Sequence, residues 1–357
     1  MDVVVFSEMH RRSPRYALNF IVREASIIAR LQRAIPSHAG RRDERAVPLG
    51  IGDDAAVVRA SRALDWVVST DAFVEGAHFL ARLHPARSIG YKALARATSD
   101  LAAMGATPRW FLLTLSLPTR RAGNWLDEFA RGMSGAAHRF GMRLIGGDVS
   151  RHTSIVAALT VIGEVRTGRA MRRSGARPGD AIYVTGRLGA AEAGLGLLRR
   201  GGPTAIKRHA RSYSLQRHLY PEPRLAIGEW LAREKLASAA MDLSDGVSTD
   251  LARLCEASGA GALLRSDAIP CAPDARSESP TPWQRLLLRA LHGGEDYELL
   301  FTVPPRRAKR IPQTFHGVPI TRIGEITSQR GVRLLDRAGR LRLLSAGGWD
   351  HFSRTTR

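Results

Sequence analysis

The chain has 357 residues, enough for two domains of ordinary size, and 44% of them are hydrophobic, which suffices for globular cores. Its formal net charge is +21, but lysine occurs only at positions 92, 207, 235 and 309, and the arginines are spread over the whole length. Because no single basic stripe results, nucleic-acid binding is not expected as the main function, although the charge would help to attract phosphorylated substrates.

No segment of the sequence has the features of a membrane-spanning helix or a signal peptide. The apolar runs fall well short of the roughly 20 residues that a membrane span needs, and charged residues follow closely on the short apolar segment at 3–6. The sequence therefore predicts a cytoplasmic protein with no membrane partner. Cys255 and Cys271 lie in no CxxC motif or Cys/His cluster, so neither a zinc site nor a redox site is expected.

In chain order, the spacing of apolar residues predicts alternating strands and helices with a seam near the middle. Residues 1–21 are basic and irregular, and we interpret them as an N-terminal extension. Helices are expected at 25–31, 86–103, 126–140 and 190–198, and strands at 47–51, 55–58, 66–69, 110–117, 142–145, 154–164 and 181–185. A polar, turn-rich stretch at 165–180 indicates the seam, so two α/β domains are predicted at 22–165 and 166–357.

Aspartates recur in short clusters at the ends of apolar segments. They occur in GIGDD (50–54), VSTD (68–71), SD (99–100), GGD (146–148) and MDLSDG (241–246). Each cluster alone could have a local purpose, since Asp53 or Asp54 could cap a turn and Asp245 could begin one. Burying several carboxylates together is costly unless cations compensate their charge. Five such clusters in one chain therefore favour a shared Mg²⁺ site, because Mg²⁺ prefers oxygen ligands.

The familiar nucleotide-binding motifs are absent from the sequence. No lysine follows a glycine as a GxxxxGK[ST] loop requires, no GxGxxG opens a suitable strand–helix unit, and no kinase catalytic loop or DFG motif occurs. If the chain uses ATP, metal ions and glycine-rich backbone must hold the phosphates in another way.

Eight motifs run in order along the chain. They are GIGDDAAVV (50–58), STDAFVEGAHF (69–79), GYKALARATSDLAAMGATP (90–108), IGGDVSR (145–151), GDAIYVTGRLGAAEAGL (179–195), DLSDGVSTDL (242–251), GGEDYELLF (293–301) and GWDHF (348–352). Together they resemble the thiamine-monophosphate kinase family over residues 22–352. DD or GGD alone is common, whereas the ordered set with GGEDYELLF and GWDHF is specific. The wider superfamily contains aminoimidazole ribonucleotide synthetase, selenophosphate synthetase and a hydrogenase maturation protein.

The resemblance implies both a fold and a reaction. The fold is an α/β (α+β) architecture of two domains, like that of aminoimidazole ribonucleotide synthetase, in which N-terminal strands of two subunits form a barrel across a homodimer. The reaction transfers the γ-phosphate of ATP directly, in line, to thiamine phosphate, giving ADP and thiamine diphosphate with the help of several Mg²⁺ ions.

The resemblance also assigns roles to individual residues. The residues implied to bind metal are Asp54, Ser69, Thr70, Asp71, Asp100, Asp148, Asp242 and Asp245. The residues implied to bind ATP are Gly147, Asp148, Arg173 and Ser244, and those implied to contact the thiamine substrate are His78, Glu295 and Trp349. The residues implied to be catalytic are Asp71, Asp148 and Asp245. The acceptor phosphate is already ionised near neutral pH, so charge neutralisation and positioning are the main tasks. A glycine lets backbone N–H groups approach phosphate, an arginine can grip it, and a tryptophan offers a flat face to a cationic ring.

Other interpretations stay open at several positions. Trp349 could instead pack the C-terminal tail onto the core, and His78 could be a core histidine beside Phe79. Only its place in the motif selects Glu295 over the acidic residues at 296 and 298. The sequence departs from the family pattern at Ala55, Ala72, Val149, Ser150 and His152, which removes no implied ligand.

Two alternative functions remain. One is another ATP-using superfamily member acting on a different small phosphate or carbonyl substrate; the other is a basic nucleic-acid-binding protein on a retired kinase fold. The chain lacks the reactive cysteine of selenophosphate synthetase and the C-terminal cysteine of the hydrogenase maturation protein. Every implied metal ligand is intact, which favours the kinase.

Overall fold

The computed structural model describes residues 47–50, 52–273 and 282–349, which all belong to one compact unit spanning His38–Trp349. The predicted extension at 1–21, the predicted helix at 25–31 and the end of the GWDHF motif lie outside the described residues. Within the described ranges, no helix is long and apolar enough to cross a membrane.

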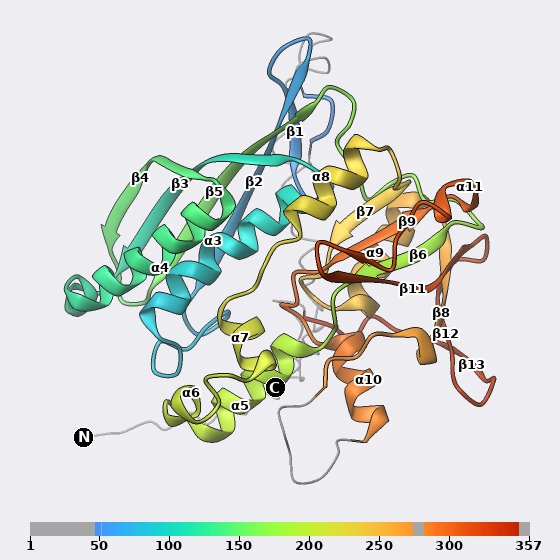
Figure 1. The fold of residues 1–357 in the computed structure, drawn as a ribbon. Coiled ribbons are helices and arrows are strands. Elements are labelled where there is room, and N and C mark those ends of the chain that lie inside the picture. The colour runs from blue at the N-terminus through green and yellow to red at the C-terminus, as the bar shows by residue number, and fades with distance from the viewer. Residues whose placement is uncertain (1–46, 51, 274–281, 350–357) are drawn as a thin grey trace, which may run out of the picture. The chain divides into compact units, whose positions relative to one another are not determined.

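A five-stranded sheet is built from the first part of the chain (Figure 1). Its strands are β1 (Ala56–Arg59), β2 (Leu64–Val74), β3 (Thr107–Leu117), β4 (Arg143–Arg151) and β5 (Val156–Arg166), in the order β1-β2-β5-β3-β4. Neighbouring strands are antiparallel except β3 and β4. Along β5, buried residues alternate strictly with half-buried or exposed ones, which is the period of a strand with one face against a core.

Helices α3 (Ala86–Ala103) and α4 (Asn124–Phe140) pack together and cover one face of this sheet (Figure 1). Gly90 and Gly132 permit their close approach, because a Cβ at either position would lie 2.0 or 1.8 Å from a carbonyl oxygen of the facing helix. On the other face of the sheet, Trp66, Thr70 and Ala72 of β2 are exposed. The five-stranded sheet therefore has one buried and one open face.

An eight-stranded sheet is built from the second part of the chain. Its strands are β6 (Ala181–Thr185), β7 (Ala239–Asp242), β8 (Gly261–Arg265), β9 (Leu299–Val303), β10 (Thr314–Phe315), β11 (Val318–Thr327), β12 (Gly331–Leu335) and β13 (Leu341–Leu343), in the order β13-β12-β8-β11-β6-β9-β7 with β10 beside β11. The helices around it are α5 (Ala190–Gly201), α6 (Thr204–Arg208), α7 (Tyr213–Leu219), α8 (Leu225–Arg233), α9 (Val247–Ser258), α10 (Trp283–His292) and α11 (Pro305–Ala308). The predicted α/β (α+β) fold class is confirmed.

The C-terminal end of α3 packs against the second part of the chain. Ala102 and Ala103 share a buried cluster with Leu231 of α8 and Phe301 of β9. Larger cores lie beside each sheet separately. Since α3 packs against both parts of the chain, side chains on this helix can contact loops from either part.

Two predicted elements are confirmed with their bounds, and one is wrong. The helix at 86–103 and the strand at 181–185 agree with α3 and β6. In place of the predicted strand at 47–51, the described residues there form only an isolated bridge between Leu49 and Val57. β2 is longer than the predicted 66–69, because it pairs with β5 along its whole length. The domain division at 165 stays a prediction.

Candidate active site

Three carboxylates from distant parts of the chain meet at one point. Asp54 lies just before β1, Asp100 is in the last turn of α3, and Asp242 is the last residue of β7. One oxygen of each carboxylate lies within 4.8 Å of the others. Asp54 and Asp242 are buried, and Asp100 is half-buried. The structure thus brings together three of the residues predicted to bind metal, which we call the carboxylate cluster.

Ser69 and Arg173 hold the carboxylate cluster in place. The hydroxyl of Ser69, on β2, donates to Oδ2 of Asp100 at 2.5 Å and to the backbone oxygen of Asp54 at 3.2 Å. Arg173 donates from Nε to Oδ1 of Asp54 at 2.8 Å, and its backbone N–H donates to Asp53 at 3.0 Å. Arg173, predicted to contact ATP, is therefore bound to a predicted metal ligand.

Burial and mutual repulsion disfavour the ionised form of these carboxyl groups. Burial raises the pKa of Asp54 to about 7, with Asp242 adding to the rise and Arg173 opposing it. Burial also raises the pKa of Asp242 to about 6. The pKa of Asp100 lies well above its usual range because of burial and the neighbouring carboxylates. A divalent cation would offset both the burial and the repulsion.

The donors of the carboxylate cluster fit a magnesium ion. Oδ2 of Asp54 is buried and has no hydrogen-bond partner among the described residues. Carboxylate oxygens are the ligands that Mg²⁺ prefers in proteins. The cluster contains neither histidine nor cysteine, the usual zinc ligands. Its chemistry therefore agrees with the predicted metal.

One side of α3 carries three residues that each contact a part of the site. Lys92, Arg96 and Asp100 are four residues apart, which places them on the same side of a helix. Arg96 binds both oxygens of Asp71 on β2, at 2.6 and 2.9 Å. Nζ of Lys92 lies 2.9 Å from Oε2 of Glu295. Lys92 and Arg96 are not among the residues predicted from the sequence, although their spacing to Asp100 is a signal for them.

Asp245 lies in the turn between β7 and α9. Its backbone N–H donates to Oδ2 of Asp250 at 3.0 Å, and Arg253 contacts both carboxylates. The charge of Asp245 adds to the rise in the pKa of Asp242, after burial, so this turn borders the carboxylate cluster. The backbone N–H of Trp349 donates to the oxygen of Asp245 at 3.2 Å. The chain therefore returns to the site at its last described residue.

The segment GGEDYELLF lies beside the same turn. The backbone N–H of Glu295 donates to the oxygen of Ser244 at 2.8 Å. Glu295 and Tyr297 have φ angles of 69° and 50°, values that residues other than glycine rarely adopt. The structure thus brings Ser244, Glu295 and Trp349 to the turn that carries Asp245.

His78 lies in the turn that follows β2. Its Nδ1 accepts a hydrogen bond from the backbone N–H of Val74 at 3.0 Å, and its ring lies 5.8 Å from that of Phe73. These contacts are those of a residue that closes a turn. A role of His78 in substrate binding stays a prediction.

Thr70 and Asp148 lie on the open face of the five-stranded sheet. Side chains alternate along a strand, and Asp71 points to α3 through Arg96, so Thr70 points the other way. Asp148 of β4 pairs with Thr114 of β3, which pairs with Ala158 of β5, which in turn pairs with Ala72 of β2. Because paired residues point to the same face of a sheet, Asp148 lies on the same face as the exposed Ala72, and Asp148 is itself exposed. In the described part of a single chain, these two residues therefore do not join the carboxylate cluster.

Gly147 occupies a position that only glycine fits. Its φ is 154°, and a Cβ there would lie 1.9 Å from the carbonyl oxygen of Leu113 on β3. The glycine lets β4 run against β3 at this point. Binding of ATP by Gly147 stays a prediction.

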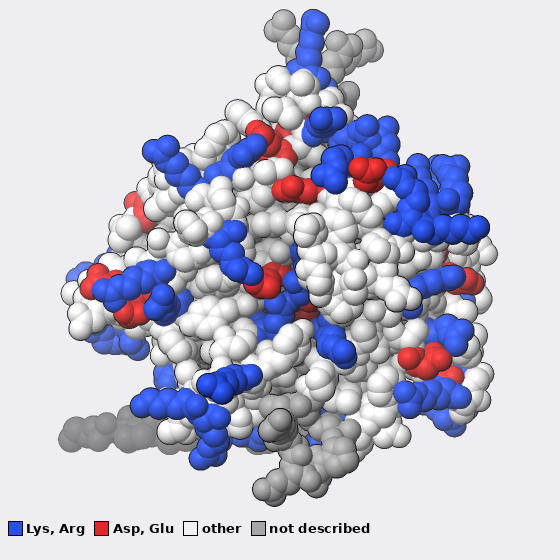
Figure 2. Space-filling model, viewed as in Figure 1, with Lys and Arg blue, Asp and Glu red and all other residues white. Residues whose placement is uncertain are grey.

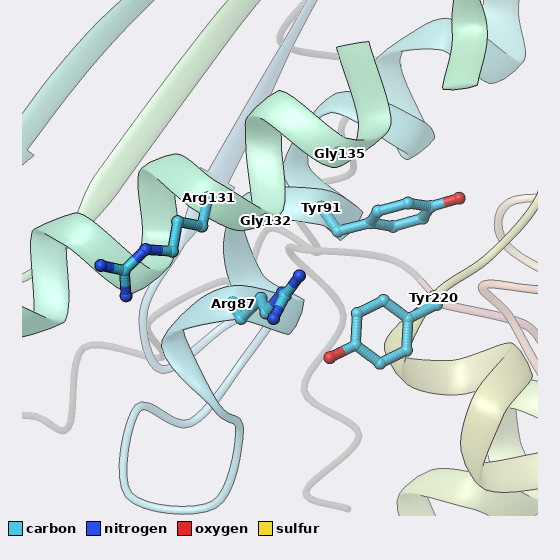
Figure 3. A pocket seen from close by; sticks show the side chains of 6 residues that line it. All are labelled: Arg87, Tyr91, Arg131, Gly132, Gly135 and Tyr220. Atoms are coloured by element: carbon cyan, nitrogen blue, oxygen red, sulfur yellow. The ribbon is translucent and has the colours of Figure 1, made fainter. Parts of the chain in front are cut away.

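A pocket of about 400 Å³ is lined by none of the predicted site residues. It lies between α3, α4 and the end of α7, and its lining residues are Arg87, Tyr91, Arg131, Gly132, Gly135 and Tyr220 (Figure 3). The rings of Tyr91 and Tyr220 are 5.3 Å apart at an angle of 73°. Basic side chains are distributed over the face of the molecule that Figure 2 shows.

Comparison with known proteins places the chain in a family. The family described as AIR synthase related protein, N-terminal domain, matches residues 52–165, and the corresponding C-terminal domain matches residues 177–337. Thiamine-monophosphate kinase of Escherichia coli is 42% identical over 309 residues, which is 86% of this chain and 93% of that protein. The kinase of Bacillus subtilis is 35% identical over 86% of this chain and 94% of its own length.

Solved structures agree with this placement. A structure of AaThiL complexed with AMPPCP and TMP has a TM-score of 0.75 and 30% identity, covering 92% of this chain and 97% of that one. Thiamine-monophosphate kinase from Stenotrophomonas maltophilia has a TM-score of 0.69 and 35% identity, covering 87% and 96%. The resemblance of the eight motifs is thereby confirmed: the chain belongs to the thiamine-monophosphate kinase family.

Proposed function

We propose that the protein uses ATP to phosphorylate thiamine phosphate, releasing ADP and thiamine diphosphate. The observation that carries this proposal is the carboxylate cluster of Asp54, Asp100 and Asp242, in a chain 42% identical to a kinase of that name. The structure of AaThiL with AMPPCP and TMP supports it, since the two chains share one fold over 92% of this chain.

Magnesium is the metal that we assign to the carboxylate cluster. Asp54, Asp100 and Asp242 would hold it, with Ser69, Asp71 and Asp245 at the border of the cluster. The metal would supply charge neutralisation for the phosphates.

The nucleotide-binding groups proposed from the motifs are an arginine beside the carboxylate cluster and residues of β4 and of the β7–α9 turn. Arg173 carries a fixed positive charge next to the carboxylate cluster, where phosphate oxygens would approach. Gly147 and Asp148 of β4 and Ser244 of the β7–α9 turn would complete the nucleotide site. Because Asp148 and Thr70 lie on the open face of the sheet, their roles as ligands are the least supported of the set.

The thiamine end of the acceptor is proposed to lie at Glu295, Trp349 and His78. Glu295 can attract the cationic ring of thiamine phosphate, and the indole of Trp349 offers an aromatic face to it. The alternatives to Glu295 in the same motif are occupied elsewhere, since Asp296 and Glu298 are both buried in other contacts. Since the acceptor is already anionic, no proton has to be removed from it, and Asp71 and Asp245 would act by helping to position Mg²⁺.

A homodimer is proposed from the outer strand of the five-stranded sheet. β4 is the outer strand, and all of its residues are exposed. Its apolar side chains Leu144, Ile145 and Val149 are 50%, 52% and 71% exposed. Contiguous exposed apolar surface on a sheet is typical of an interface. Sedimentation velocity should show a dimer that Val149→Glu weakens; a wild-type monomer at micromolar concentration would contradict the proposed barrel.

A substrate screen tests the proposed function. Purified protein, ATP and Mg²⁺ are incubated with thiamine phosphate, with free thiamine or with other small phosphates, and ADP release is measured. Release should depend on thiamine phosphate and on Mg²⁺. Equal release with free thiamine, or none with thiamine phosphate, would contradict the proposal.

A further inference from the structure

Lys92 is a fully buried lysine whose contacts explain why it is there. It lies in the middle of α3 and is only 2% exposed. Burying an unpaired ammonium group is costly, so a lysine is rarely found in such a place without a counter-ion. Burial lowers the pKa of Lys92, and the carboxylate of Glu295, 2.9 Å away, opposes that shift.

The same carboxylate oxygen of Glu295 also faces a buried pair of histidines. Nδ1 of His218, on α7, lies 3.5 Å from Oε2, and Nε2 of His218 lies 2.9 Å from Nε2 of His84. Burial lowers the pKa of His84 to about 4 and that of His218 well below its usual range. Both imidazoles are therefore neutral at neutral pH. Among the described residues, Lys92 is then the full positive charge in direct contact with Glu295.

The backbone that presents Glu295 is held by its neighbours in an unusual conformation. Asp296 accepts hydrogen bonds from the backbone N–H groups of Gly189 and Ala191 at the start of α5. Glu298 is bound by Arg217 at 3.0 Å and by Arg224 at 2.6 Å. These contacts maintain the positive φ angles of Glu295 and Tyr297. The side chain of Glu295 is 24% exposed, and its contacts with Lys92 and His218 both involve Oε2, which leaves Oε1 outside these two contacts.

The positions on α3 connect this carboxylate to the carboxylate cluster. Lys92 and Asp100 are separated by two helical turns, and a rise of 1.5 Å per residue puts their Cα atoms about 12 Å apart. Arg96, which binds Asp71, lies midway. One rigid helix thus contacts Glu295, Asp71 and the carboxylate cluster in sequence.

We propose that Lys92 is a positioning residue, which holds Glu295 in place to bind the thiamine end of the acceptor. Two turns further along the same side of α3, Asp100 belongs to the metal-binding carboxylates. α3 would thereby set the span between the cationic ring and the phosphate that is transferred. The inference rests on the proposed function, because it takes the cationic ring of thiamine phosphate as the ligand of Oε1. Lys92 neutralises Oε2, and Oε1 faces the ring.

The first test changes Lys92 to Met, which has a similar length but no charge. Without its counter-ion, Glu295 loses its fixed orientation. We expect the KM for thiamine phosphate to rise about 10- to 100-fold, the loss that is typical when a residue that orients a binding group is removed. The KM for ATP and kcat should keep their wild-type values. Lys207→Met is the matched control, because Lys207 is exposed and makes no ion pair among the described residues.

The second test is a double-mutant cycle with Glu295→Gln. If Lys92 acts through Glu295, adding Lys92→Met to Glu295→Gln causes no further rise in the KM for thiamine phosphate. The double variant also lacks the stranded carboxylate, so its melting temperature should exceed that of Lys92→Met alone. If Lys92→Met alone does not fold, the comparison of Glu295→Gln with the double variant still tests the inference, because a further rise in the KM for thiamine phosphate would overturn it.

Several outcomes would overturn the inference. One is an equal rise in the KM for thiamine phosphate and the KM for ATP in Lys92→Met. Another is a wild-type KM for thiamine phosphate in Glu295→Gln. A third is a KM for thiamine phosphate in the double variant that rises by the product of the two single effects. If both variants that carry Lys92→Met are insoluble, Glu295→Gln alone is compared with the wild type, and an unchanged KM for thiamine phosphate overturns the inference. Failure of the proposed function is seen separately, as wild-type protein that releases no ADP with thiamine phosphate.

Discussion

Changing Asp100 to Asn should stabilise the metal-free protein and weaken its stabilisation by Mg²⁺. One carboxylate oxygen each of Asp100, Asp54 and Asp242 lies within 4.8 Å of the other two. Two ionised carboxylates at that distance repel by about 3 kcal/mol at an effective dielectric constant of about 20. Because the pKa values of Asp54 and Asp242 are raised to about 7 and about 6, these two carboxyl groups are partly protonated at neutral pH, and we expect a gain of about 1–2 kcal/mol. The amide keeps the shape of the side chain and still accepts the hydrogen bond of Ser69.

The assay is thermal unfolding with and without Mg²⁺, together with ADP release. A gain of 1 kcal/mol raises the melting temperature by about 1–2 °C in a chain of 357 residues, because the entropy of unfolding grows with length. Mg²⁺ at 100 times its dissociation constant should stabilise the wild type by about 2.7 kcal/mol. In Asp100→Asn that increment should mostly vanish, and turnover should fall with it. Asp127→Asn, at an exposed position in the first turn of α4, is the control and should retain both.

Two results would refute this reasoning. If Mg²⁺ raises the melting temperature of Asp100→Asn as much as that of the wild type, the carboxylate cluster is not the metal site. If the metal-free variant melts at a lower temperature than the wild type, repulsion among the three carboxylates is not the dominant effect.

Three further predictions concern the rest of the site and its support. Trp349→Ala should raise the KM for thiamine phosphate more than the KM for ATP, since the indole is proposed to meet the thiamine; equal effects would indicate a packing role. Gly147→Ala should lower both melting temperature and turnover, because its Cβ would lie 1.9 Å from a backbone oxygen of β3; a variant with wild-type stability and activity would contradict that geometry. Burial alone would raise the pKa of Glu298, but its two arginine partners outweigh burial and lower it below 4.5. The stability that this carboxylate contributes is therefore complete above the unfolded pKa and is lost as the pH falls through the folded pKa. Glu298→Gln should cost about 3–5 kcal/mol at neutral pH, as measured by denaturant unfolding, with a smaller difference from wild type in acid; a pH-independent difference would contradict the ion pair.

The carboxylate cluster could be predicted in part because its members lie at the ends of apolar segments or inside them. Asp54 lies just before β1, Asp100 lies in the last turn of α3 and Asp242 ends β7, and the fold brings these positions together. Alternation along β2 could also have separated Ser69 and Asp71 from Thr70, since neighbours on a strand point to opposite faces. That step needs the strand to include residues 70 and 71, and the predicted strand ends at residue 69.

The partners of the site residues were harder to predict, because they depend on tertiary contacts. In the sequence, Lys92 and Arg96 look like ordinary helix residues. Only the folded structure shows that Glu295 lies beside Lys92 and Asp71 beside Arg96. The strand β4 extends beyond the predicted 142–145 because it pairs with β3 through the GGD motif, where glycines suggest a loop. Local sequence carries no information about such pairings.

The most direct test of the proposed function is to follow the phosphate itself. The purified protein is given ATP labelled at the γ-phosphate, thiamine phosphate and Mg²⁺, and the products are separated. We predict that the label appears in thiamine diphosphate in the same amount as the ADP released. Label found only in inorganic phosphate, with no thiamine diphosphate formed, would contradict the proposed function.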